Sequence, residues 1–292
     1  MSLFPILLPL AVLQVGPNPY NTSVIGGPDD LRNRPERPQD PSQPAALTDP
    51  SAAWLSQCLT QLETDAARAH AQAQIKRSEG LGVERVVANH CLGLAATELG
   101  LWDDARAAFI AARDETPEGE IRARARFGAM AGNAALGGGD AAGALTLLEA
   151  AQVDAQTSAS TPLQVITAID TARALVALDR GEEALAPLEI ATSLAPQASE
   201  GWLLKATLLR RLDRLGDAQA AIEQAVALSP QEGDIGLEAG VIAILAGRED
   251  AARASWQSVI DTQPDSLAAE SARGYLAQVG PVQPAVSEDP TP

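Results

Sequence analysis

Apolar and small residues recur along the middle of the chain with the three- and four-residue spacing of amphipathic helices. The stretch 201–230 reads GWLLKATLLRRLDRLGDAQAAIEQAVALSP. Because apolar positions at i, i+3, i+4 and i+7 share one face of a helix, this stretch predicts two helices that pack together. The later stretch REDAARASWQSVIDTQP repeats the second half of the pattern, and its Ala252 lies 34 residues after Ala218.

A repeat of 34 residues accounts for this spacing. With Ala218 at position 20, three tandem repeats cover 165–198, 199–232 and 233–266, and two more cover 86–119 and 125–158. Most repeats carry small residues at positions 8, 20 and 27, a larger residue at 24 and a proline at 32; in 86–119 these are Gly93, Ala105, Ala112, Phe109 and Pro117. Segment 52–85 is predicted to be a degenerate first repeat, with Ala71 and Ile75 at positions 20 and 24.

This pattern resembles that of the tetratricopeptide-repeat (TPR) family, whose repeat is a helix-turn-helix of 34 residues. The resemblance covers about 52–266 and implies an all-α fold, a TPR-type α-solenoid in which stacked repeats form a right-handed superhelix with a concave groove. After the last repeat, 265–279 has an amphipathic pattern, with Ala268, Ala272, Tyr275, Leu276 and Val279 at helical spacing. We predict a cap helix there, so that the solenoid occupies 51–279.

Composition supports this prediction and excludes some partners. The chain has 292 residues, of which 46% are apolar but only 3% aromatic, so its core is expected to consist of closely packed small-residue helices rather than aromatic layers. Its formal net charge of −17 repels nucleic-acid phosphates and anionic membrane surfaces. Nucleic acid is therefore not an expected partner.

The two ends of the chain differ from the middle. Residues 1–16, MSLFPILLPLAVLQVG, form an apolar run of the length of a signal-peptide core, too short to span a membrane as a stable helix. We predict an export signal, although no Lys or Arg precedes the run and Gln14 would occupy the minus-three position of a cut after Gly16; the alternative is an apolar N-terminus that is retained. Residues 17–50 are predicted to be a disordered, proline-rich linker, and 280–292 a disordered tail.

The residues that could carry catalysis or bind a metal form no recognisable motif. The glycine-rich stretch Leu136–Ala144 lacks the Gly-Lys-Ser/Thr ending of a phosphate-binding loop and is expected to be the turn within a repeat. His70 and His90 are the only histidines, and neither they nor the two cysteines show metal-ligand spacing. A Cys91–His90 catalytic pair is disfavoured because adjacent helical residues point about 100° apart. We therefore expect a noncatalytic protein with no cofactor and no metal.

The two cysteines favour another interpretation. Cys58 and Cys91 fall at positions 7 and 6 of the first two repeats, on first helices that are expected to be neighbours. This geometry permits a disulfide, which together with an export signal would fit an oxidising compartment. Two buried free thiols in a cytosolic protein are the alternative.

The TPR resemblance also indicates where a partner would bind. In that family, ligand peptides usually contact positions 2, 5, 6, 9, 12 and 13 of the first helix of each repeat. The matching candidates for a partner-binding groove here are Arg126, Asn133, Ile169, Arg173, Leu203, Thr207, Arg210 and Arg211. Arginine forks suit carboxylate partners, but these arginines can instead pair with Asp170, Glu200 and Glu238 on the protein itself. Of the chaperone-binding clamp of the family only Asn133 matches, so recognition of a chaperone C-terminus is not expected.

The sequence therefore predicts a protein-interaction scaffold that binds a partner protein or peptide through the groove, in the bacterial periplasm after removal of the signal. The alternative is a cytoplasmic TPR protein that regulates an enzyme or binds a small ligand. A fold of this kind serves many roles, so the sequence names no partner.

Overall fold

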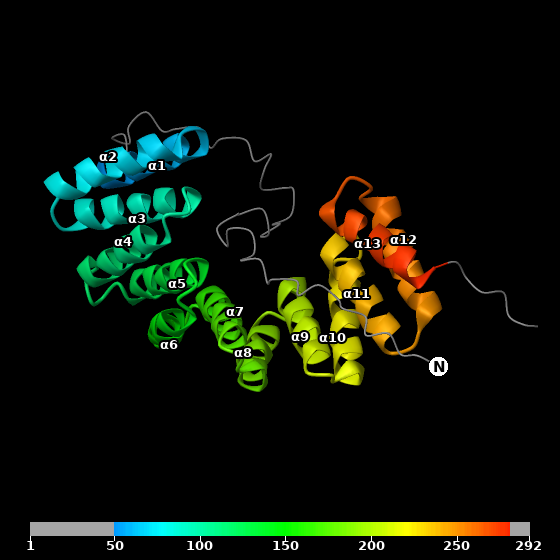
Figure 1. Cartoon of the computed structure of the whole chain (residues 1–292). Helices are drawn as coiled ribbons and strands as arrows, with labels where there is room; N and C mark the ends of the chain where they lie inside the picture. Colours follow the sequence, from blue (N-terminus) through cyan, green and yellow to red (C-terminus); the bar gives the residue numbers. More distant parts are fainter. Residues whose placement is uncertain (1–49, 281–292) are drawn as a thin grey trace, which may run out of the picture. The chain divides into compact units, whose positions relative to one another are not determined.

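A computed structural model of the chain describes residues 50–280 and contains thirteen α-helices and no strand in that range (Figure 1). The predicted signal 1–16, nearly all of the linker 17–50 and nearly all of the tail 280–292 lie outside the described residues. The helices are α1 Pro50–Thr64, α2 Ala66–Glu79, α3 Val83–Glu98, α4 Trp102–Glu115, α5 Ile121–Gly137, α6 Ala141–Thr157, α7 Thr161–Ala177, α8 Gly181–Leu194, α9 Ser199–Arg211, α10 Leu215–Leu228, α11 Gly233–Leu245, α12 Glu249–Thr262 and α13 Leu267–Val279.

The helices group into two compact units, which divide between Asp179 and Arg180. The first unit contains α1–α7 and the second contains α8–α13. Within each unit most helices pack against the next one in the chain, as in Figure 1 for α3, α4 and α5. The division falls inside the predicted repeat 165–198, whose first helix is α7 and whose second helix is α8.

The turn between the two helices of a repeat has the same conformation five times. Its middle residue, at position 15, has a positive φ. Glycine adopts this conformation freely, whereas L-residues other than Asn and Asp rarely do. The five residues and their φ angles are Gly100 (69°), Gly139 (81°), Asp179 (58°), Asp213 (59°) and Gly247 (74°). The glycine-rich stretch around Gly139 is thus the turn between α5 and α6, as predicted, and its Asp140 accepts a capping hydrogen bond from the Gly143 amide at 2.9 Å.

The two helices of a repeat pack through a small residue at position 8 and a large residue at position 24. In three repeats position 8 is a glycine, and an added Cβ would overlap the facing side chain; the pairs are Gly93 with Phe109, Gly132 with Leu148, and Gly240 with Trp256. Position 20 is an alanine in all five repeats between 86 and 266, and each of these alanines is fully buried: Ala105, Ala144, Ala184, Ala218 and Ala252. The small-residue pattern therefore sets how closely the helices approach.

Substituting one of these glycines should destabilise the fold. Gly93→Ala places a methyl group against the Phe109 ring and is expected to lower the free energy of unfolding by about 1–3 kcal/mol, because a packed core accommodates added volume poorly. The control is Gly216→Ala on α10, where nothing lies within 4 Å of the added Cβ. This change should be neutral or stabilising by up to about 1 kcal/mol, the helix-propensity gain of alanine. Urea unfolding followed by circular dichroism measures both, and equal effects would contradict the prediction.

The predicted register of the first repeat is wrong by two residues. Ala71 and Ile75 are exposed, whereas Ala69 and Ala73 are fully buried. The cause is the turn between α1 and α2, which is the single residue Asp65, whereas each of the later repeats uses three residues at this place. The shorter turn moves every inward-facing position of α2 two residues earlier in the chain.

Helices α1 and α3 are neighbours, as the cysteine interpretation required. Cys58 on α1 and Cys91 on α3 are 5% and 0% exposed, and their Sγ atoms are in close contact. The two Cα atoms lie 6.3 Å apart, within the range that disulfides span. They belong to a core cluster with Leu92 and Ala95 of α3, at the N-terminal end of the first unit.

Ion pairs connect successive second helices in the first unit. Arg113 on α4 donates to Asp154 on α6 at 2.8 Å, and Arg106 on α4 donates to Asp140 at the start of α6 at 2.7 Å. The Arg113 side chain crosses Gly128 of α5, where an added Cβ would lie 3.4 Å from its Cδ. The absence of a side chain at Gly128 therefore leaves room for this bridge.

The helix predicted over 265–279 is α13, which begins two residues later, at Leu267. Ser266 caps it by accepting a hydrogen bond from the Ala269 amide at 3.0 Å. Ala268 and Ala272 are buried, and Tyr275, Leu276 and Val279 pack against the core of the last repeat, as the pattern predicted. The outer face of α13 is mostly polar, which suits the end of a repeat array.

Candidate functional site

The first unit places four of the candidate binding residues on α5 and α7. Arg126 is exposed, and Asn133 and Arg173 are partly exposed. Ile169 is only 5% exposed, so its side chain belongs to the core and is not available to a ligand in this structure. The ligand-contacting positions of the TPR family did not reveal that Ile169 is buried, since they define a helix face and not the packing of each side chain on it.

Arg173 is committed to an internal contact. Its guanidinium donates to the Asp170 carboxylate at 2.8 Å, and Asp170 is 1% exposed. A carboxylate buried to this extent requires a cation or several hydrogen bonds to remain charged. Arg173 therefore stabilises the fold around Asp170.

The second unit places the other four candidates on α9. Leu203, Thr207 and Arg210 are partly exposed, and Arg211 is exposed. Arg210 forms a two-pronged ion pair with Glu238 of α11, in which Nε lies 2.6 Å from Oε1 and an Nη lies 3.3 Å from Oε2. Both side chains are less than a fifth exposed, so this pair joins the first helices of two successive repeats. For Arg173 and Arg210, the alternative of internal ion pairing is confirmed.

Two candidate cations remain directed to solvent. Within residues 50–280, neither Arg126 nor Arg211 has a carboxylate oxygen within 4.0 Å. The Arg126 guanidinium lies 5.2 Å from the centre of the Phe127 ring, and the same ring contacts His90 of α3 edge to face at 5.2 Å. Arg126 can therefore donate to an external anion while its guanidinium stays near the aromatic ring.

Burial keeps His90 neutral. Loss of solvation, together with the smaller effect of the Arg126 charge, lowers the pKa of its imidazole to about 4. A neutral imidazole does not compete with Arg126 for an anion, but neither does it act as an acid near neutral pH. His90 contacts Phe127, and Cys91 contacts Cys58, so these neighbours do not form a nucleophile and base.

The described part of the chain contains no group of three or more His, Cys, Asp or Glu side chains placed to hold a metal ion. Between Pro50 and Gly280, no helix is both long and apolar enough to cross a membrane.

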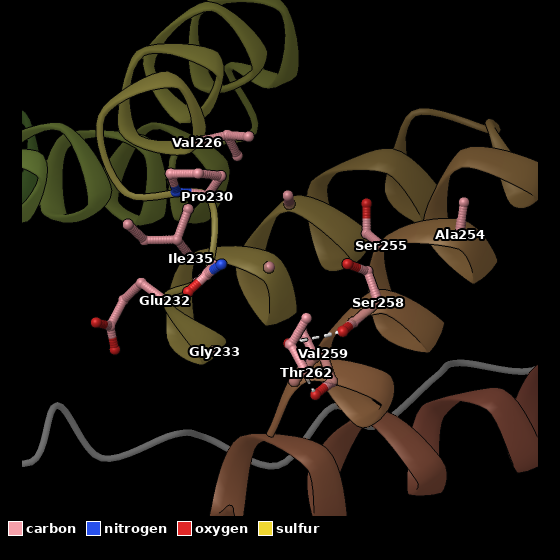
Figure 2. A pocket seen from close by; sticks show the side chains of 13 residues that line it. Val226, Pro230, Glu232, Gly233, Ile235, Ala254, Ser255, Ser258, Val259 and Thr262 are labelled. Atoms are coloured by element: carbon pink, nitrogen blue, oxygen red, sulfur yellow. Dashed lines mark hydrogen bonds between the residues drawn. The ribbon is translucent and has the colours of Figure 1, made fainter. Parts of the chain in front are cut away.

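Two open cavities lie in the second unit, both between second helices of successive repeats. One, of about 440 Å³, lies between α8 and α10 over Trp202 of α9. The other, of about 270 Å³, lies between α10 and α12 over the start of α11 and is called here the α10–α12 pocket (Figure 2). Sequence reasoning missed both because it considered only the groove lined by first helices.

The solved structures similar to this chain have low sequence identity to it. PilW, a widely conserved type IV pilus biogenesis factor, has a TM-score of 0.63 and 16% identity, and the match covers 76% of this chain and 98% of PilW. For PilF of Pseudomonas aeruginosa the TM-score is 0.58, the identity 14% and the coverage 77% and 97%. For MamA of Desulfovibrio magneticus RS-1, from residue 41 to its end, these values are 0.52, 16%, 62% and 97%. No protein-family model and no curated protein sequence matches the chain.

Proposed function

Because this chain has the tetratricopeptide-repeat fold, like the similar solved structures, we propose that it is a noncatalytic scaffold that binds a partner protein or peptide through the first helices of its repeats. Stacked helical repeats of this fold support protein interaction in general, since the stacked first helices present an extended surface to a partner. In each unit, the face formed by the first helices of the repeats is called here the helix-A face of that unit.

The observation that carries this proposal is that the arginines of the helix-A face differ in their contacts. Arg173 and Arg210 are held in internal ion pairs, whereas Arg126 and Arg211 are exposed. On this face of a chain with a net charge of −17, an exposed arginine without a nearby carboxylate can pair with an acidic group of a bound partner.

Apolar and polar residues accompany these arginines within each unit. Asn133 is on the same helix as Arg126, and Leu203 and Thr207 precede Arg211 on α9. On the adjoining first helix α11, Leu245 is 41% exposed. Each unit therefore has its own candidate binding surface, which combines one exposed cation with side chains that suit an apolar or hydrogen-bonding residue of a peptide.

Charge reversal at the two exposed arginines tests the proposal. Crosslinking in the native cell followed by mass spectrometry identifies the partner, and the affinity of the purified partner is then measured by calorimetry. We expect Arg126→Glu combined with Arg211→Glu to weaken binding by at least about tenfold, because like charges at an interface repel. The fold should be unaffected, since both positions are exposed.

The control changes the charge by the same amount elsewhere. Arg68 and Arg77 are exposed on α2, a second helix of a repeat, and their replacement by glutamate should leave the affinity unchanged. Equal weakening in the two variants would indicate a long-range charge effect, and no weakening in the first would place binding outside the helix-A face. Either outcome contradicts the proposal.

We further propose that the protein works in the bacterial periplasm. The support is the close contact of Cys58 with Cys91 on neighbouring helices, which suits a disulfide and hence an oxidising compartment. An N-terminal sequence read from the native protein that begins at Met1, together with free thiols, would instead favour the cytoplasm.

A further inference from the structure

The α10–α12 pocket lies beside a repeat position whose side chain differs between repeats. Its floor includes Gly236, which is position 4 of the repeat 233–266. Position 4 of the preceding repeat is Trp202, whose indole Nε1 donates to the Pro196 carbonyl at 3.0 Å. Pro230, which is equivalent to Pro196, lines the pocket. The last repeat therefore lacks an indole that its neighbour has at the same position.

A second repeat with glycine at position 4 shows another way of filling this space. In 125–158 that glycine is Gly128, and the Arg113 side chain crosses it to reach Asp154 at 2.8 Å. The residues equivalent to Arg113 and Asp154 around Gly236 are Val226 and Thr262. A valine and a threonine cannot form this bridge. Val259 occupies the place of a Cβ at Gly236, and the pocket is open beside it, between Val226 and Thr262.

The walls of the pocket are apolar on one side and carry hydroxyl groups on the other. Figure 2 shows Val226, Pro230 and Ile235 facing the α12 wall, which presents Ser255, Ser258, Val259 and Thr262. The only charged residue among those that line the pocket is Glu232, an exposed residue just before α11. No basic side chain lines it, so a cationic ligand meets a carboxylate and no opposing positive charge.

The volume limits what can enter. About 270 Å³ lies below the usual range for small-molecule pockets, about 300–1,000 Å³, but accommodates one large side chain. Tryptophan and tyrosine combine an apolar body with a polar edge that seeks a hydrogen bond when buried. This combination matches a space bounded by Val226 and Ile235 on one side and by serine hydroxyls on the other.

We propose that the α10–α12 pocket binds a tryptophan or tyrosine side chain of a partner, in a segment that also carries arginine or lysine. The aromatic ring lies in the pocket beside Gly236, at the repeat position that carries Trp202 in the preceding repeat. Its polar edge donates to the Pro230 carbonyl, as Trp202 donates to Pro196, and the flanking cation pairs with Glu232. The pocket lies between second helices, so it is separate from the helix-A face and independent of the function proposed there.

A capped tripeptide serves as the probe. Ac-Arg-Trp-Arg-NH₂ is titrated into the ¹⁵N-labelled full chain, and amide shifts are followed by NMR. We expect saturable shifts at Gly233, Gly236 and Ser258. Ac-Arg-Ala-Arg-NH₂ and Ac-Glu-Trp-Glu-NH₂ should each bind at least about tenfold more weakly, since one lacks the ring and the other has the wrong charge.

A matched pair of variants locates the binding. Ser258 is exposed on the α12 wall, so Ser258→Trp should fill the pocket without disturbing the fold and weaken binding of Ac-Arg-Trp-Arg-NH₂ by at least about tenfold. Ser193→Trp makes the same change at an exposed position of α8 that lines neither cavity, and should leave the affinity unchanged. Circular dichroism confirms that both variants fold.

Three results would overturn the proposal. They are the absence of saturable shifts at millimolar probe, equal binding of the alanine peptide, and undiminished binding by a folded Ser258→Trp protein. Charge reversal at Arg126 and Arg211 should not alter binding of the probe, which separates this pocket from the helix-A face.

Discussion

Reduction of the native protein should release two thiols, at Cys58 and Cys91, and lower the free energy of unfolding of the α1–α2 hairpin and α3 by about 3–4 kcal/mol. That value is the chain-entropy expectation for a crosslink between residues separated by 33 positions. The effect should concentrate at the N-terminal end of the first unit, because the main packing partners of α1 are α2 and α3. Hydrogen exchange of amides in α1–α3, with and without reductant, measures it.

The variant with Cys58→Ala and Cys91→Ala provides the control. It should already show the faster exchange of the reduced protein and should not respond to reductant. If both thiols of freshly isolated native protein alkylate before any reductant is added, the disulfide is absent. The proposed periplasmic location then loses its structural support.

The 34-residue period predicted most of the fold because it specifies local contacts. A small residue at position 8 and a large one at position 24 determine how a helical hairpin packs, and Gly93 with Phe109 illustrates this directly. The period failed for α2 because a single-residue turn at Asp65 replaced the usual three-residue turn. An insertion or deletion in a turn shifts the register of a helix without changing its amphipathic character, so the pattern of α2 alone did not reveal it.

The candidate site was less predictable because it depends on pairings between repeats. The sequence placed Arg173 and Arg210 on the helix-A face, but whether a guanidinium faces a ligand or an internal carboxylate depends on the distance to Asp170 or Glu238. The pocket over Gly236 could have been anticipated by comparing position 4 across repeats. Such a comparison shows Trp202 in one repeat and Gly236 at the same position of the next, but the open volume follows only from how Val226, Val259 and Thr262 pack.

Trp256→Ala should give the largest stability change in the second unit, a loss of about 3–5 kcal/mol in the free energy of unfolding. Trp256 is 2% exposed, donates from Nε1 to the Leu237 carbonyl at 3.1 Å, and packs against Tyr275 of the cap helix with ring centres 5.2 Å apart. Its removal leaves a cavity against Gly240, where no side chain is present to fill the space. Hydrogen exchange in α11–α13 reports the loss without relying on tryptophan fluorescence.

A second substitution distinguishes this packing argument from a general loss of hydrophobicity. Gly240→Leu alone should destabilise, because its side chain would overlap the Trp256 indole. In the Trp256→Ala background, however, the same leucine enters the cavity from the opposite helix. In repeat 199–232 the residues at positions 8 and 24 are Ala206 and Ile222, and both are buried. We therefore expect the double variant to be more stable than the sum of the single effects predicts, by at least about 1 kcal/mol. Simple additivity would mean that position 8 and position 24 do not share one packing volume, and the proposed basis of the repeat would be wrong.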